Sequence, residues 1–191
     1  MKNIRIIKSE SLSEYKYRLT KVTFTYEDRL GRKKAQTKEI YDRGDGAVIL
    51  LYNKEKKSIL LTKQFRLATY LNHNKDGIIV EACAGQLDGQ HPDKAIVREV
   101  SEETGYEVHD IQKVFEAYTS PGSVTEILHF YIAAYTDEMK VNDGGGLEEE
   151  GEEIEVVELQ FDQAYNMIAT GEIRDCKTIM LLQYVKIQNI I

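Results

Sequence analysis

The pattern of apolar and polar residues in the first half of the chain is mostly that of strands, and part of it alternates as half-buried strands do. Residues 17–44, "YRLTKVTFTYEDRLGRKKAQTKEIYDRG", alternate on both sides of a turn at 28–31 and predict a two-stranded β-hairpin. Two further strands are predicted at 46–53 and 58–66. The apolar run 77–85, "GIIVEACAG", predicts one more strand that ends in glycine.

The period changes to that of a helix at residues 92–104, and Gly105 suits the left-handed position just after a helix. At about 100° per residue, Glu99, Glu102 and Glu103 gather at the edge of the apolar stripe that faces the core. Charges that only face solvent lie opposite such a stripe. Like charges at this spacing repel by about 0.2–0.5 kcal/mol per pair, so we expect a ligand to offset the repulsion.

The second half of the chain mixes strands and helices. Strands are predicted within 110–120 and 125–136, followed by an acidic, glycine-rich segment at 142–159 that is expected to be a mobile loop entering a strand. Two helices are predicted at about 161–170 and 177–189. The sequence therefore predicts an α/β (α+β) fold.

Composition limits the classes of protein that fit. The chain has 191 residues, 42% of them hydrophobic, which is enough for one core. The net charge of −7 argues against a surface for nucleic acid or anionic membranes. No apolar run of about 18 residues is present, and residues 1–10 lack the apolar segment of a signal peptide, so we expect a cytoplasmic protein. Cys83 and Cys176 are predicted to be reduced thiols that fill space, and the four histidines lack zinc-ligand spacing.

A helix that presents three carboxylates at the end of a strand suits a hard cation such as Mg²⁺ or Mn²⁺, which prefers oxygen ligands. Such a cation polarises phosphoryl oxygens and lowers the pKa of a bound water. The residues alone leave open that the helix is amphipathic and merely acidic. Arg66 and Arg43 suit bidentate contact with phosphate, although each could equally form a surface salt bridge.

Residues 84–108, "AGQLDGQHPDKAIVREVSEETGYEV", resemble the Nudix box, G-x5-E-x7-R-E-U-x-E-E-x-G-U, in which U is aliphatic. The R-E-x-x-E-E-x-G core is intact from Arg98 to Gly105. There are two departures from the box. The stretch from Gly85 to Arg98 is one residue short, and Gln90 stands where the box has its first glutamate. The helix glutamates are the principal metal ligands of the family, so the departures affect the start of the helix more than the metal cluster.

The resemblance extends to nearly the full chain. Residues 120–126, "SPGSVTE", are similar to the SPG-x-x-x-E element of the ADP-ribose and nucleoside-diphosphate-sugar pyrophosphatase branch. The segments "YDRGDGA", "KQFRLATY", "NDGGGLEEE" and "TGEIRDCKT" together resemble the GDP-mannose pyrophosphatases of that branch. This resemblance implies a Nudix α/β/α sandwich with a mixed sheet at 44–191. It also implies a small β-rich subdomain at 1–43 for dimerisation and substrate contact, and a domain-swapped homodimer.

The same resemblance implies the site residues. The implied metal ligands are the carbonyl of Ala84 and the carboxylates of Glu99, Glu103 and Glu152. The implied catalytic residues are Glu102, Glu103, Glu150 and Glu152. A one-residue insertion in the late loop leaves Glu149 and Glu150 open as alternatives to Glu152. The implied substrate contacts, with Tyr15 as an alternative to the first, are Tyr17, Lys38, Glu39, Arg43, Arg66, Gly85, Glu126 and Lys177.

The expected reaction is attack of water on the diphosphate of GDP-mannose with Mg²⁺ or, alternatively, Mn²⁺, giving GMP and mannose 1-phosphate. Two alternatives stay open. An ADP-ribose or other ADP-sugar pyrophosphatase shares the Nudix box and the SPG element. A non-catalytic Nudix-like module that binds nucleotide is the other, and Gln90 is its only support, because the helix glutamates are intact.

Overall fold

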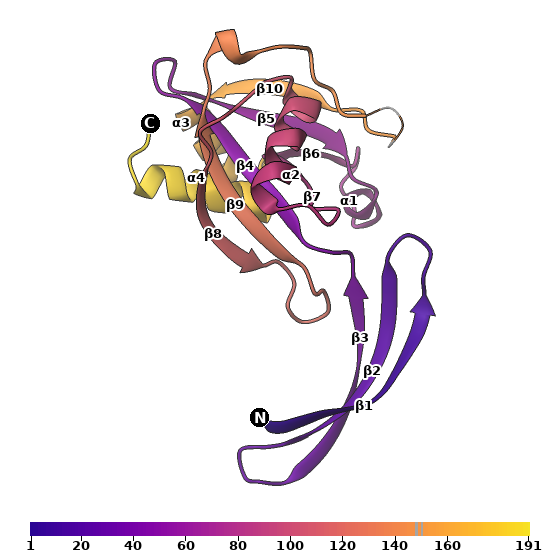
Figure 1. The fold of residues 1–191 in the computed structure, drawn as a ribbon. Coiled ribbons are helices and arrows are strands. Elements are labelled where there is room, and N and C mark those ends of the chain that lie inside the picture. Colours follow the sequence, from indigo (N-terminus) through magenta and orange to yellow (C-terminus); the bar gives the residue numbers. More distant parts are fainter. Residues whose placement is uncertain (148, 150) are drawn as a thin grey trace. The chain divides into compact units, whose positions relative to one another are not determined.

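The computed structural model describes residues 1–147, 149 and 151–191, so the candidate catalytic residue Glu150 lies outside the described residues. The chain forms two compact units (Figure 1). The N-terminal unit consists of residues 1–45 and 117–128, and the central unit consists of residues 46–116 and 129–191. The roles expected of residues 1–43 in dimerisation and substrate contact stay predictions.

The N-terminal unit contains a three-stranded antiparallel sheet in the order β1 (Lys2–Ser13), β2 (Arg18–Glu27) and β3 (Lys33–Asp42). The predicted hairpin is confirmed as β2 and β3, and the Gly31 N–H donates to the Asp28 carbonyl at 3.1 Å across the turn. Strand β1 precedes this hairpin and was not predicted. Strand β1 is exposed almost throughout, and irregularities interrupt its register with β2, so no clean alternation marks it in the sequence.

The central sheet is a seven-stranded mixed sheet, with β10-β5-β4-β9-β8 as its main path. In this sheet β6 also pairs with β5, and β7 also pairs with β4. Its strands are β4 (Gly46–Asn53), β5 (Ser58–Phe65), β6 (Ile78–Glu81), β7 (Cys83–Gln86), β8 (Gln112–Tyr118), β9 (Ile127–Ala134) and β10 (Glu155–Gln160). The strands predicted at 46–53, 58–66, 110–120 and 125–136 are therefore confirmed.

The single strand predicted at 77–85 is wrong, because this segment forms both β6 and β7. The two strands pair with different neighbours, and the break falls at Ala82. The Ala82 N–H donates to the buried Thr178 hydroxyl at 2.7 Å. A distant side chain therefore bonds the amide at the break, and the local sequence does not show this partner.

Among the described residues, four α-helices accompany the sheet: α1 (Leu67–Leu71), α2 (Pro92–Glu99), α3 (Phe161–Thr170) and α4 (Cys176–Ile187). The two helices predicted near the C-terminus are confirmed as α3 and α4, whereas α1 was not predicted. A 3₁₀ turn, η2, spans Asp137–Met139.

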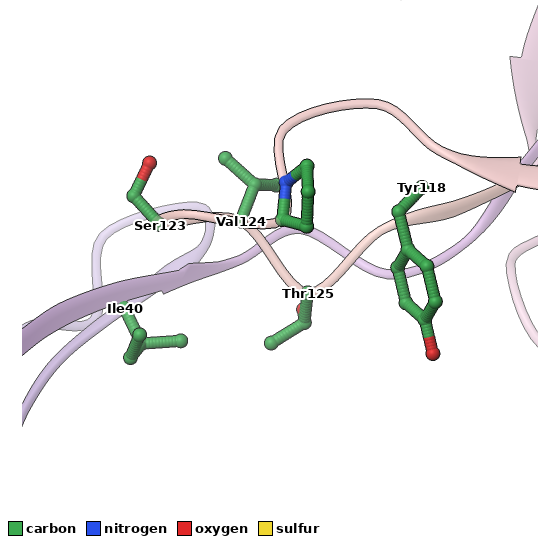
Figure 2. Close-up of a pocket in the computed structure, with 6 residues that line it drawn as sticks. Ile40, Tyr118, Ser123, Val124 and Thr125 are labelled. Carbon is green, nitrogen blue, oxygen red and sulfur yellow. The ribbon is translucent and has the colours of Figure 1, made fainter.

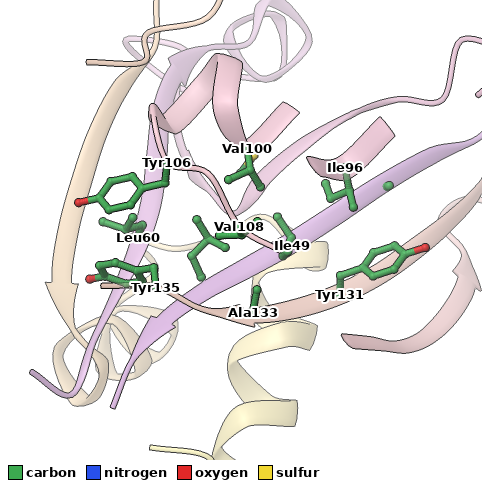
Figure 3. Close-up of a cluster of buried hydrophobic side chains, with 12 residues drawn as sticks. Ile49, Leu60, Ile96, Val100, Tyr106, Val108, Tyr131, Ala133 and Tyr135 are labelled. Carbon is green, nitrogen blue, oxygen red and sulfur yellow. The ribbon is translucent and has the colours of Figure 1, made fainter. Parts of the chain in front are cut away.

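Helices cover both faces of the central sheet, as the sandwich fold predicted. On one face, Ile49 of β4 packs in a buried cluster with Ile96 and Val100 (Figure 3). Alternate residues of a strand point to opposite faces, so Val48 and Leu50 face the other side, where α4 contacts β4. Both residues are fully buried.

The helix predicted at 92–104 changes type along its length. Helix α2 ends at Glu99, and a π-helical turn, η1 (Val100–Thr104), continues it to Gly105, whose φ of 76° is left-handed as predicted. The Thr104 hydroxyl donates to the Val100 carbonyl at 2.6 Å, taking the acceptor that an α-helical amide would use. Short π-helical turns inside helices are frequent at functional sites.

Both cysteines are free thiols, as predicted. Cys83 is buried, but Cys176 is exposed, so the prediction that both fill space is wrong for Cys176. Among the described residues, no helix is both long and apolar enough to cross a membrane.

Candidate active site

The acidic cluster, which we define as Glu99, Glu103 and Glu152, lies in the central unit. Glu99 ends α2, Glu103 belongs to η1, and Glu152 precedes β10. The residue exposures of Glu99 and Glu103 are only 9% and 2%. Helix α2 and η1 both contact β7, so the fold presents these two carboxylates to the sheet.

Strand β7 approaches the two helix glutamates closely. A Cβ atom on Gly85 would lie 1.9 Å from the Glu99 carboxyl carbon, so a larger residue at this position would displace the Glu99 carboxylate. The neighbouring Ala84 N–H donates to Glu103 Oε2 at 3.3 Å. The predicted ligand positions Ala84, Glu99 and Glu103 are thus brought together.

The carboxylates of the acidic cluster repel one another. Burial, together with repulsion from Glu102 and Glu152, raises the pKa of Glu99 to about 7 even though Arg98 acts in the opposite direction. Burial, together with repulsion from Glu99 and Glu152, raises the pKa of Glu103 to about 8. The Cys83 thiol and the Ala84 amide, both neutral, offset only part of this effect. The cluster therefore stabilises any cation that binds beside it.

Arg98 holds two of the helix glutamates in place. Its guanidinium donates to Glu99 Oε1 at 2.7 Å and to Glu102 Oε2 at 2.6 Å. Glu102 is thus directed toward Arg98, whereas Glu103 is directed toward β7. The catalytic role implied for Glu102 stays a prediction.

The donor set fits a hard cation. Every side chain of the acidic cluster offers carboxylate oxygen, and Gly85 leaves room for close approach to Glu99. Within the described part of the chain, no group of three or more His, Cys, Asp and Glu side chains is placed so that it could hold a metal ion. Glu152 Oε2 accepts instead from the Leu147 N–H at 3.3 Å, and its role as a metal ligand stays a prediction.

A second charged group, which we define as the clamp, consists of Glu81, Arg66 and Lys177. The Arg66 Nε and Nη2 atoms donate to the two carboxylate oxygens of Glu81 at 2.9 and 3.2 Å. Lys177 Nζ also contacts Glu81 Oε2, and it lies 2.9 Å from Asp175 Oδ1. Arg66 and Lys177 were predicted as substrate contacts, and the structure places them on one carboxylate.

The clamp balances its own charge. Burial acts to raise the pKa of Glu81, but Lys177 and Arg66 outweigh burial and hold the pKa below its ordinary value. Glu103 and Glu152 also act electrostatically on Arg66, so the clamp lies within reach of the acidic cluster. The clamp and the acidic cluster are therefore electrostatically coupled within the central unit.

The other predicted substrate contacts lie in the N-terminal unit. Arg43 lies 3.5 Å from Glu126 and 5.9 Å from the ring centre of Tyr17, which packs edge-on against Tyr41. Lys38 and Glu39 are exposed neighbours on β3. The alternative Tyr15 is almost fully exposed.

The SPG element is bound to β3 inside the N-terminal unit. The Tyr41 N–H donates to the Ser123 carbonyl at 2.7 Å, and the Thr125 N–H donates back to the Tyr41 carbonyl at 3.1 Å. An open hollow of about 420 Å³ lies here (Figure 2). Its lining residues are Ile40, Tyr118, Pro121, Ser123, Val124 and Thr125.

The sequence prediction missed Glu81 and Asp175. Glu81 is the only charged residue in the apolar run at 77–85, and a buried charge needs a partner. That exception to the apolar pattern was the available signal. Asp175 resembles an ordinary helix N-cap, and it does cap α4 by accepting from the Thr178 N–H at 2.9 Å, so nothing local indicates its contact with Lys177.

Comparisons with known proteins identify the family of the chain. Residues 42–180 match the NUDIX domain model, and residues 3–41 match the model of the GDP-mannose pyrophosphatase NudK N-terminal domain. The chain is 48% identical over 188 residues to the GDP-mannose pyrophosphatase of Cronobacter sakazakii, and 52% identical over 188 residues to that of Yersinia enterocolitica. Each alignment covers 98% of this chain and 97% of the relative. The chain therefore belongs to the Nudix family of hydrolases, in the branch of the GDP-mannose pyrophosphatases, as its helix motif and flanking segments predicted.

Proposed function

We propose that the chain hydrolyses the diphosphate bond of GDP-mannose in a Mg²⁺-dependent reaction and releases GMP and mannose 1-phosphate. The observation that carries the proposal is the pair of buried glutamates, Glu99 and Glu103, beside the cationic side of the clamp. Similarity over nearly the full length to relatives named GDP-mannose pyrophosphatase supports the choice of substrate.

Glu99, Glu103, Glu152 and the carbonyl of Ala84 would hold the cation. When bound there, Mg²⁺ polarises phosphoryl oxygens and lowers the pKa of a coordinated water. The buried helix glutamates keep their oxygens oriented through Arg98 and the Ala84 amide. Preorganised charge of this kind is usually the largest single contribution to catalysis.

The protein's own groups then position the substrate and move the proton. Arg66 and Lys177 contact the diphosphate, which brings its phosphorus atoms beside the acidic cluster. A carboxylate oxygen of Glu152 accepts the proton of the attacking water. Glu149 and Glu150 are the alternatives for this base.

The proposal includes a homodimer in which the N-terminal strands of one chain complete the site of the other. Tyr17, Lys38 and Glu39 would contact the substrate bound by the partner. A three-stranded sheet with exposed apolar residues on β1 needs a further surface to cover it, which supports an exchanged arrangement. The cytoplasmic location expected from the sequence stays a prediction.

Subunit mixing tests the shared site. A Glu103→Gln chain and a Lys38→Ala, Glu39→Ala chain are each expected to be weakly active. After subunit exchange, a mixed dimer should regain one competent site. A sedimentation profile of a monomer under assay conditions, or mixtures without recovery despite demonstrated exchange, would contradict the shared site.

A substrate panel tests the reaction. The protein is incubated with Mg²⁺ and GDP-mannose, ADP-ribose or ADP-glucose in ¹⁸O-labelled water, and the products are identified by mass. We expect the highest kcat/KM for GDP-mannose, with the label identifying the phosphorus that is attacked. A preference for ADP-sugars would favour the alternative substrate. Nucleotide binding without turnover would favour the non-catalytic module.

A further inference from the structure

Glu81 is buried, with a residue exposure of 3%, and the established family motif does not include it. We propose that Glu81 is a positioning residue, which holds Arg66 and Lys177 in the orientation in which both contact the diphosphate of the substrate. This inference rests on the proposed function, because it assigns a role within the same site.

The Glu81 carboxylate fixes the plane of the Arg66 guanidinium. Two parallel N–H···O bonds join Nε and Nη2 to the two carboxylate oxygens, which is the bidentate geometry that arginine favours. The side-chain exposures are 4% for Glu81 and 41% for Arg66. One edge of the guanidinium is therefore bound to Glu81, while the rest of the group remains accessible to an anion.

The same carboxylate fixes Lys177 through a set of bonds that joins two elements. Lys177 contacts Glu81 at the end of β6 and Asp175 at the start of α4. Asp175 Oδ2 accepts from Thr178, and the Thr178 hydroxyl accepts from the Ala82 N–H, next to Glu81 in the chain. Lys177 therefore has a fixed position relative to Arg66, although 111 positions separate them in the sequence numbering, from 66 to 177.

The segment that carries Glu81 also carries the expected metal ligand. Ala84, whose amide binds Glu103, lies three positions after Glu81, and Gly85 contacts Glu99 next. One short segment thus sets the positions of both the clamp and the acidic cluster. A diphosphate with a bound cation needs the positive groups of the clamp and the negative groups of the acidic cluster at a fixed separation. This segment fixes that separation.

A double-mutant cycle tests the proposal. Calorimetry gives the Kd for GDP and for ADP, in Mg²⁺, with the full-length chain. Because the clamp would act on the diphosphate and not on the base, Glu81→Gln should weaken both nucleotides by about 10- to 100-fold. In an Arg66→Ala, Lys177→Ala background, the same substitution should change Kd by less than about twofold, because the groups it positions are gone.

A merely structural role of Glu81 would give a different result. The loss of affinity would then be similar in both backgrounds and would follow the loss of thermal stability, and this result would overturn the proposal. If a multiple variant does not fold, the cycle is repeated with Arg66→Ala alone as the background. The variant Glu81→Asp is then used in the same cycle. Glu158→Gln is the matched control, because it removes a carboxylate from another polar group of the same sheet.

The cycle also separates this inference from the proposed reaction. Strong coupling in GDP binding, with no hydrolysis of GDP-mannose by the unaltered protein, would support the clamp and contradict the reaction. Hydrolysis of GDP-mannose with additive effects in the cycle would support the reaction and contradict the role of Glu81.

Discussion

Glu81 and Glu103 are buried to nearly the same degree, with exposures of 3% and 2%, yet their pKa values move in opposite directions. Burial raises the pKa of both carboxyl groups. At Glu81, Lys177 and Arg66 outweigh burial, and the pKa falls below its ordinary value. At Glu103, the carboxylates of Glu99 and Glu152 add to burial, and the pKa rises to about 8.

The difference shows where the protein depends on a ligand. The charge of Glu81 is balanced by side chains of the same chain, so its ionised form is stable without a ligand. The neutral donors beside Glu103 do not balance its charge. A buried carboxylate that repels its neighbours is costly to the folded state, and such a cost is common at functional sites. The following predictions test this contrast.

Glu103→Gln should have the largest effect. We expect kcat to fall by at least about 100-fold, because one ligand charge is removed. The metal-free variant should be no less stable than the unaltered protein, because a destabilised buried charge is removed as well. Steady-state kinetics and thermal unfolding measure the two effects.

The matched control for this substitution is Glu107→Gln, which changes an exposed carboxylate shortly after the same motif. It should leave both kcat and thermal stability nearly unchanged. A Glu103→Gln variant with near-normal activity at saturating Mg²⁺ would show that Glu103 is not a metal ligand.

Arg66→Ala tests the clamp. If Arg66 contacts the diphosphate, kcat/KM should fall by about 10- to 100-fold, and by a similar factor for every nucleotide sugar. Tyr17→Ala should instead change the ranking among the sugars if that ring stacks on the base. Unchanged kinetics for Arg66→Ala across the panel would mean that its ion pair with Glu81 is only structural.

The pH dependence of Mg²⁺ stabilisation tests the acidic cluster. The ordinary carboxyl pKa is 4.5, and the folded values are about 7 for Glu99 and about 8 for Glu103. Between the ordinary pKa of 4.5 and the folded values of about 7 and about 8, the folded state binds more protons than the unfolded state. The metal-free protein therefore loses stability as pH rises through this range. Deprotonation also favours Mg²⁺ binding.

Saturating Mg²⁺ should therefore raise the Tm by about 5 °C or more at pH near 8.5, and by much less at pH near 5.5. Differential scanning fluorimetry at both pH values measures the two shifts. Glu103→Gln should remove most of the difference. Equal shifts at both pH values would mean that cation binding does not involve these carboxyl groups.

The sequence predicted the parts of the molecule that follow local rules. Alternation identified β2 and β3, apolar runs identified β4 and β5, and helical spacing identified Glu99 and Glu103 as neighbours. The sequence did not predict β1, because an exposed and irregular edge strand has no alternation of buried and exposed residues. It did not predict the role of Glu81 either, since its partners lie 15 and 96 positions away and meet it only in the folded chain.

A third carboxylate gives the smallest predicted effect and sharpens the contrast. Glu158 accepts hydrogen bonds from Ser58 at 2.6 Å and Tyr135 at 2.8 Å, and Lys56 lies 3.5 Å away. Burial acts to raise its pKa, but these partners outweigh burial and lower it. Glu158 balances its charge within the chain, as Glu81 does, but its partners belong to neither the acidic cluster nor the clamp, so Glu158→Gln should leave activity unchanged.

The stability of Glu158→Gln should depend on pH in a defined direction. We expect a loss of about 1 kcal/mol in the free energy of unfolding at neutral pH, where the charged acceptor is intact in the unaltered protein. A carboxylate with a lowered folded pKa stabilises the protein above its ordinary value of 4.5 and loses that contribution as pH falls. Urea unfolding near pH 7 and near pH 3.5 should therefore show the difference between the two proteins shrinking in acid. A difference that is equal at both pH values would mean that Glu158 stabilises the sheet through packing and not through its charge.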